Sequence, residues 1–167
     1  VPSGPTWTEQ QKPRAGDAAP GDLFGIAAAL SGDTAVLGAR LDDHSALANA
    51  GSAYVVTRKG TVWTEEQKLT ASDAGAGDWF GIAVGVSGDT AVVGAFQDDD
   101  GGADSGSAYV FARSGATWSE ADKLTAGDAA AGDWFGVSIA LEGGAAVGGA
   151  GKDDHGRFHE ARPAYVV

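Results

Sequence analysis

One segment occurs three times in this chain, and it restricts the possible folds more than any other feature. The copies read GDLFGIAAALSGDTAVLGA, GDWFGIAVGVSGDTAVVGA and GDWFGVSIALEGGAAVGGA. Phe24, Phe80 and Phe135 mark the same point in each copy, and they lie 56 and then 55 residues apart. A fixed period of this length is typical of solenoids, propellers and other repeat architectures.

Each copy predicts a β-hairpin that is buried on both faces. From Phe80 to Val86 large apolar residues alternate with glycine and alanine, which is the period of two that a strand produces. Residues 87–90 supply a short turn of Ser, Gly, Asp and Thr, and residues 90–95 return as a second apolar strand. We expect the small side chains to let a neighbouring sheet approach closely.

Two further strands complete each repeat. An Ala-Tyr-Val segment predicts a third strand at residues 53–56, 108–111 and 164–167. A tryptophan segment predicts a fourth strand at 63–69 and 118–124, with an N-terminal copy at 7–12. The fourth strand alternates apolar and charged residues, as an outer, half-exposed strand does. Four antiparallel strands per repeat predict an all-β fold, a β-propeller with three blades per chain.

The order of the strands predicts how the ring closes. We expect residues 1–167 to form a single propeller domain or half of one, with repeats at about 22–69, 78–124 and 133–167, and residues 1–12 to form a spare, closing outer strand. Propellers usually have about four to eight blades. We therefore expect a six-bladed homodimer in which the N-terminal strands are exchanged. A fragment of a larger propeller is the alternative, and a β-trefoil fits less well because its units are shorter.

Composition narrows the range of partners. The net charge is -12, from 23 acidic and 11 basic residues, which argues against nucleic acid and anionic membranes. No apolar run approaches the roughly 20 residues of a membrane span, so membrane insertion is not expected. There is no cysteine, which excludes a disulfide framework. The chain begins with Val1 instead of Met, which favours a processed protein that is secreted or on the cell surface.

The repeats resemble the FG-GAP repeat of integrin α-subunit propellers and their bacterial relatives. Phe-Gly opens the first predicted strand of each copy, at Phe24, Phe80 and Phe135, and Gly-Ala ends each copy. The position of the family's proline holds Arg40, Phe96 and Gly151. The resemblance implies a propeller that acts in adhesion, ligand recognition or sugar binding. It does not carry over the calcium loops of the family, because the turns between the first two strands are too short to wrap an ion.

Aspartates dominate the loops at one end of the predicted meander. Pairs recur after each Gly-Ala, at Asp42-Asp43, Asp98-Asp99 and Asp153-Asp154. Aspartates in loops usually accept backbone N–H bonds. The alternative is that the pairs bind a ligand, and no cofactor is certain. If a cation binds, Asp98, Asp99 and Asp100 are the candidate ligands for Ca²⁺.

Trp79 and Trp134 precede the Phe-Gly, where the first repeat has Leu23. They either cover the edge between neighbouring blades or stack on a sugar ring. The chain shows no phosphate loop, nucleophile elbow or Ser-His-Asp order. We therefore predict a non-enzymatic ligand-binding or adhesion module that recognises a glycan, like a lectin, or a protein. The alternative is a purely structural building block of a larger extracellular protein.

Overall fold

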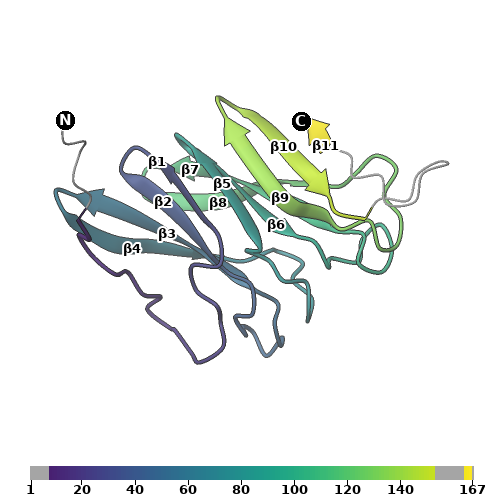
Figure 1. The fold of residues 1–167 in the computed structure, drawn as a ribbon, viewed down its shortest axis with the longest axis horizontal. Coiled ribbons are helices and arrows are strands. Elements are labelled where there is room, and N and C mark those ends of the chain that lie inside the picture. The colour runs from purple at the N-terminus through teal and green to yellow at the C-terminus, as the bar shows by residue number, and fades with distance from the viewer. Residues whose placement is uncertain (1–7, 153–163, 167) are drawn as a thin grey trace, which may run out of the picture.

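Three antiparallel sheets follow one another along the chain in the computed structural model, which describes residues 8–152 and 164–166 (Figure 1). Blade 1 contains β1 (Ala28–Ser31), β2 (Thr34–Ala39), β3 (Ser52–Lys59) and β4 (Val62–Leu69). Blade 2 contains β5 (Ala83–Ser87), β6 (Thr90–Ala95), β7 (Ser107–Ser114) and β8 (Thr117–Leu124). Blade 3 contains β9 (Phe135–Glu142), β10 (Ala145–Ala150) and β11 (Ala164–Val166). Neighbours in each sheet are consecutive strands, so the prediction of propeller blades is confirmed and the β-trefoil is excluded.

The first strand of a blade begins later than the alternation predicts. In blade 2 the strand begins at Ala83. Phe80 forms an isolated bridge with Gly51, and Gly81 lies in a turn. Gly81 has a φ of 92°, which lies in the left-handed region that favours glycine. The N–H of Phe80 donates to the carbonyl of Ala50 in the preceding blade at 2.9 Å. Phe-Gly is therefore a junction between blades, and only in blade 3 does the strand include the Phe.

Each blade packs its larger side chains against the blade before it. Val84, Val86 and Val93 of blade 2 are at most 8% exposed and share a core with Val36 and Val55 of blade 1. A second core joins blades 2 and 3 around Phe135, which is 1% exposed. Since β5 contacts β1 and β9 contacts β5, the first strands of the blades lie together along one side of the stack.

The N-terminal segment lies on blade 1 in the same way that β4 lies on blade 2. The side-chain amide of Gln11 donates to the carbonyl of Trp63 and accepts from its N–H, each at 2.8 Å. Gln67 of β4 makes the same two bonds to Trp118, at 2.7 and 2.8 Å. Residues 8–12 nevertheless pair with no strand in the part of the chain that the structure describes.

Within residues 8–152 and 164–166, no helix has the length and apolarity that crossing a lipid bilayer requires.

Candidate functional site

The loops that enter the first strands and the loops that leave the second strands lie together at one end of the blades. The N–H of Gly77 donates to the carbonyl of Ala48 at 2.9 Å, and the N–H of Trp79 to that of Asn49 at 3.3 Å. The same pair of bonds recurs one junction later, from Gly132 and Trp134. We call this surface the acidic loop end, and it comprises residues 13–27, 40–51, 70–82, 96–106 and 125–134.

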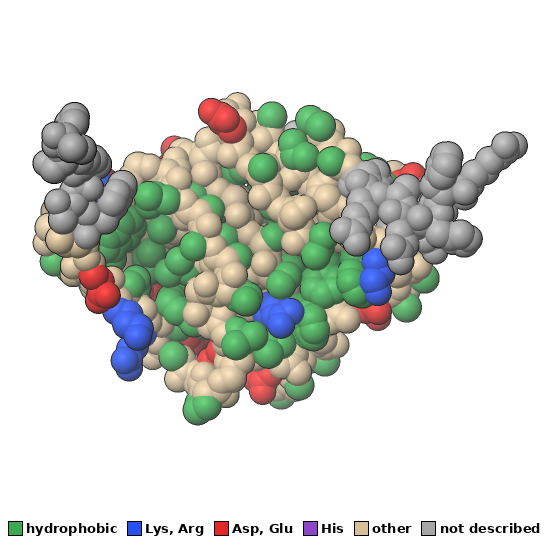
Figure 2. All heavy atoms as spheres, viewed as in Figure 1, with side chains coloured by type: hydrophobic (Ala, Val, Ile, Leu, Met, Phe, Trp, Pro, Cys, Tyr) green, Lys and Arg blue, Asp and Glu red, His purple; other side chains and the backbone are tan. Residues whose placement is uncertain are grey.

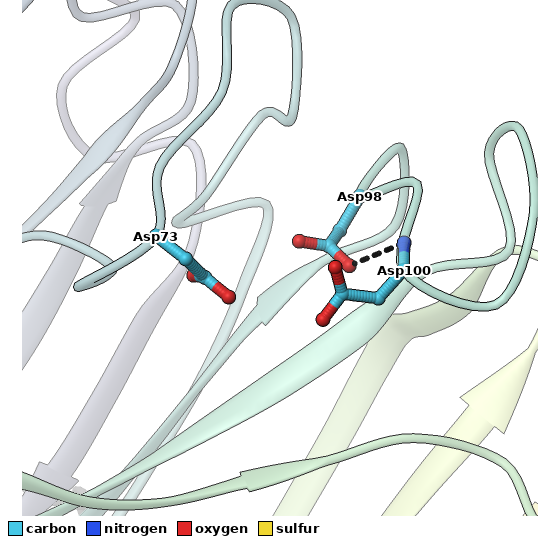
Figure 3. A group of neighbouring side chains, drawn as sticks. All are labelled: Asp73, Asp98 and Asp100. Atoms are coloured by element: carbon cyan, nitrogen blue, oxygen red, sulfur yellow. Dashed lines mark hydrogen bonds between the residues drawn. The ribbon is translucent and has the colours of Figure 1, made fainter.

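A lysine lies among three carboxylates at the acidic loop end of blade 2. The ammonium of Lys123 on β8 is 2.7 Å from Asp73, 3.0 Å from Asp98 and 2.5 Å from Asp100. The hydroxyl of Tyr109 on β7 is 2.8 Å from both Asp73 and Asp98. Figure 3 shows the three carboxylates converging from two different loops. We call these five residues the Asp–Tyr–Lys cluster of blade 2.

The charges of the cluster stabilise one another. Burial alone would raise the pKa of Asp73, but hydrogen bonds from Lys123 and Tyr109 outweigh it and hold the pKa below its usual value. Burial would lower the pKa of Lys123, and its bonds to the three aspartates raise it instead. Burial and the neighbouring carboxylates raise the pKa of Tyr109. The tyrosine is therefore a neutral hydrogen-bond donor and the lysine a fixed cation.

Blade 1 repeats the cluster, with a histidine in place of one aspartate. The ammonium of Lys68 lies 2.6 Å from Asp17 and 2.8 Å from Asp42. The hydroxyl of Tyr54 is 2.8 Å from Asp17 and 3.2 Å from Asp42. His44 takes the sequence position of Asp100. The recurrence at two blades indicates that the cluster is part of the repeat itself and ties strands 3 and 4 to both loops.

Blade 3 has the tyrosine and the first aspartate of the cluster. The hydroxyl of Tyr165 on β11 donates to Asp128 at 2.8 Å. The second aspartate position is Asp153, and Asp153 and Asp154 both lie outside the described residues. The lysine position belongs to an outer strand, and the sheet of blade 3 has three strands in the described part of the chain.

The calcium ligands expected from the sequence are not brought together as a set. Asp98 and Asp100 converge, but Asp99 turns away and accepts the N–H of Asp104 at 2.8 Å. Asp73 from another loop takes its place in the group. The ammonium of Lys123 already contacts all three of these carboxylates, so it supplies the positive charge that a Ca²⁺ ion would bring.

The two members of each aspartate pair differ in their surroundings. Asp42 and Asp98 are 3% and 4% exposed and accept the hydroxyls of Ser52 and Ser107 at 2.6 and 2.7 Å. Asp43 is exposed, and one of its oxygens accepts the N–H of Asn49 at 2.7 Å. The first member therefore belongs to the buried framework, and the second reaches solvent.

Sequence reasoning overlooked the role of Lys68 and Lys123 at this end. Both lie on the outer strand, where the charged residues of the pattern predict only an exposed face. A signal is nevertheless present, because each of the first two repeats places a tyrosine on the third strand and a lysine on the fourth. A register that pairs Tyr54 with Lys68 and Tyr109 with Lys123 brings each pair to the same edge of its blade.

Trp79 and Trp134 lie in a row of rings and cations. Phe96 contacts both indoles edge to face, with ring centroids 5.3 and 5.0 Å apart. The guanidinium of Arg40 lies 4.4 Å from the Trp79 ring, and the ammonium of Lys152 lies 3.4 Å from the Trp134 ring. Both tryptophans are half-buried. Phe96, at the family's proline position, therefore lies between the two tryptophans, and Arg40, at the same position of the first repeat, lies against Trp79.

A polar hollow of about 400 Å³ opens between the two loops of blade 1. Asp17 and Asp42, which both contact Lys68, are among its lining residues. Asp43 and Asn49 line it from the loop that follows β2. Pro20 and Leu41 add apolar surface. The hollow can therefore offer hydrogen-bond acceptors and a short apolar wall to a ligand.

Comparison with known families finds three consecutive matches along the chain. Residues 7–56, 63–111 and 118–167 each match the model of the FG-GAP repeat. No curated protein matches the chain.

Proposed function

Because the chain belongs to the FG-GAP repeat family, we propose that it is a non-enzymatic binding module that recognises a glycan at its acidic loop end. Repeats of this family are typical of extracellular proteins, are generally non-enzymatic, and suggest a propeller module of a larger protein that often binds a partner. The extracellular setting is therefore part of the proposal.

The observation that carries the proposal is the hollow of about 400 Å³ in blade 1. Its exposed members Asp43 and Asn49 carry carboxylate and amide groups, which exchange hydrogen bonds with sugar hydroxyls. Pro20 and Leu41 offer an apolar wall for the C–H face of a sugar ring. Lys68 already neutralises Asp17 and Asp42, so the hollow does not require a cationic ligand.

A glycan array followed by titration calorimetry tests the proposal. We expect a neutral glycan to bind, and Asp43→Asn to weaken its binding, because the change alters hydrogen bonding at the rim of the hollow. Asp89→Asn is the matched control, since Asp89 is exposed in the turn between β5 and β6, at the opposite end of the blades. Equal affinities for wild type and Asp43→Asn would place the glycan elsewhere, and an array without binding would overturn the proposal.

A structural building block is the second candidate. It is favoured by the apolar side chains at the two ends of the blade stack, Leu30 at 64% exposure and Val166 at 73%. Large exposed apolar groups at such positions indicate a surface that another domain covers. An assembly that forms without any glycan binding would support this role.

A further inference from the structure

We propose that a second copy of this chain supplies Lys12 to the Asp–Tyr–Lys cluster of blade 3, with residues 8–12 of each copy as the outer strand of the other's third blade. The inference goes beyond ligand recognition, because it concerns how the clusters and the ring are completed.

The N-terminal segment makes the contacts of an outer strand, but to the blade that follows it. Gln11 bonds to Trp63 as Gln67 bonds to Trp118. The N–H of Gly16 donates to Glu65 at 2.8 Å, as the N–H of Ser72 donates to Glu120 at 2.9 Å. The segment therefore already occupies the position of a fourth strand in a blade that would precede blade 1.

The register inside blades 1 and 2 predicts the register of the exchanged strand. Tyr54 is paired with Lys68, and Tyr109 is paired with Lys123. The segments 7–12, 63–68 and 118–123 align, and this places Lys12 opposite Tyr165. The ammonium of Lys12 would then lie beside Tyr165 and Asp128, as Lys123 lies beside Tyr109 and Asp73. Gln11 would lie opposite Val166.

Both ends of the blade stack expose apolar side chains whose equivalents at the internal junctions are buried between blades. Leu30 of β1 is 64% exposed, whereas Val86, at the same position in β5, is 6% exposed under blade 1. A shallow hollow of about 140 Å³ on this face is lined by Leu30, Leu37 and Trp63, beside Gln11. Figure 2 shows hydrophobic side chains gathered over the first sheet. At the other end, Val166 is 73% exposed, and it corresponds to Val110, which packs in the core between blades 2 and 3.

A second copy fits both ends at once. Propellers have about four to eight blades, and six is the one multiple of three in that range. A head-to-tail contact that closes after two copies makes a two-fold ring with two identical junctions. Lys12 and Arg14 bring positive charge to the end that holds Asp128 and Asp133. Further repeats of a longer polypeptide are the other occupant, and the test distinguishes the two.

Cysteine cross-linking tests the exchange directly, because the chain has no cysteine of its own. A tagged Gln11→Cys chain is mixed with an untagged Val166→Cys chain, refolded together and oxidised. We expect a disulfide-linked pair of one tagged and one untagged chain, since paired residues on adjacent strands lie within disulfide range. Gly60→Cys, in the exposed β3–β4 turn, replaces Gln11→Cys as the control and should give no cross-link.

Light scattering on the unmodified chain provides the second readout. We expect twice the 16.6 kDa mass of the chain, and Lys12→Met to raise the dissociation constant about tenfold or more, because it removes one partner of a charge pair at the junction. Lys59→Met, at the exposed end of β3, should leave it unchanged. If the chain is a monomer and no cross-link forms, the two ends of the blade stack contact other repeats of a longer polypeptide. If a single chain that carries both cysteines forms the disulfide within itself, its own two ends close the ring without a partner. Either result overturns the proposal.

Discussion

Gly94 of β6 and Gly136 of β9 lie so close that a Cβ on Gly94 would stand 2.0 Å from the carbonyl oxygen of Gly136. The same relationship joins Gly38 and Gly81 one junction earlier, at 1.9 Å. The backbones of successive blades therefore touch at the Gly-Ala and Phe-Gly motifs, and the small residues of these motifs are needed for the blades to stack.

Gly94→Ala should destabilise the protein by about 1–3 kcal/mol, because the methyl group forces the two backbones apart. Chemical denaturation measures the change in the free energy of unfolding. Gly127→Ala is the matched control, since a Cβ on Gly127 meets no atom within 4 Å. Equal stabilities for the two variants would show that the blades tolerate a wider separation.

Lys123→Met should lower the free energy of unfolding by up to about 3–5 kcal/mol, because it leaves the buried Asp98 without its cation. Its effect should exceed that of Lys59→Met, since Lys59 is exposed at the end of β3. The comparison is made by urea unfolding at neutral pH. A small effect that matches Lys59→Met would mean that solvent screens the cluster.

Calcium should not stabilise the wild-type protein beyond the effect of ionic strength. Because Lys123 contacts Asp73, Asp98 and Asp100, an ion would have to displace its ammonium. Melting temperatures in CaCl₂ and in NaCl of matched ionic strength should therefore agree. A specific rise with Ca²⁺ that persists in Asp98→Asn would point to a different set of ligands.

Acid should destabilise the protein through Asp17 and Asp73. The hydrogen bond from Lys68 is the main cause that lowers the pKa of Asp17, and the pKa of Asp73 is lowered despite its burial. Carboxylates with a lowered folded pKa stabilise the protein above their unfolded pKa of 3.8 and lose this contribution as pH falls below it. Burial raises the pKa of Asp78, so its titration opposes this trend.

The free energy of unfolding should therefore fall as pH drops below about 4, and Asp73→Asn should make this dependence shallower. Denaturant titrations at a series of pH values measure it. A variant with the wild-type slope would show that other carboxylates control the acid transition.

The repeated segments were sufficient to predict the blades. Alternation of large and small residues is a local property of the chain, so the order of the strands follows from it, as does the burial of both faces of the hairpin in blade 2. The hairpins of blades 1 and 3 are partly exposed, because each lies at an end of the stack. The aspartates that cap loops follow for the same reason. Asp22 and Asp78 each accept the N–H of the residue three positions earlier, Ala19 and Gly75, which is a short-range contact.

The partners of the acidic residues depend on folding. Lys123 lies 50 residues from Asp73 and 25 from Asp98 along the chain, and only the pairing of β7 with β8 and the packing of blade 2 on blade 1 bring the three together. The start of the first strand at Ala83 likewise depends on the blade before it, because Phe80 bonds to Ala50 and bridges Gly51 of the preceding blade. Contacts between blades combine residues from separate repeats, and a pattern that is read one repeat at a time does not contain them.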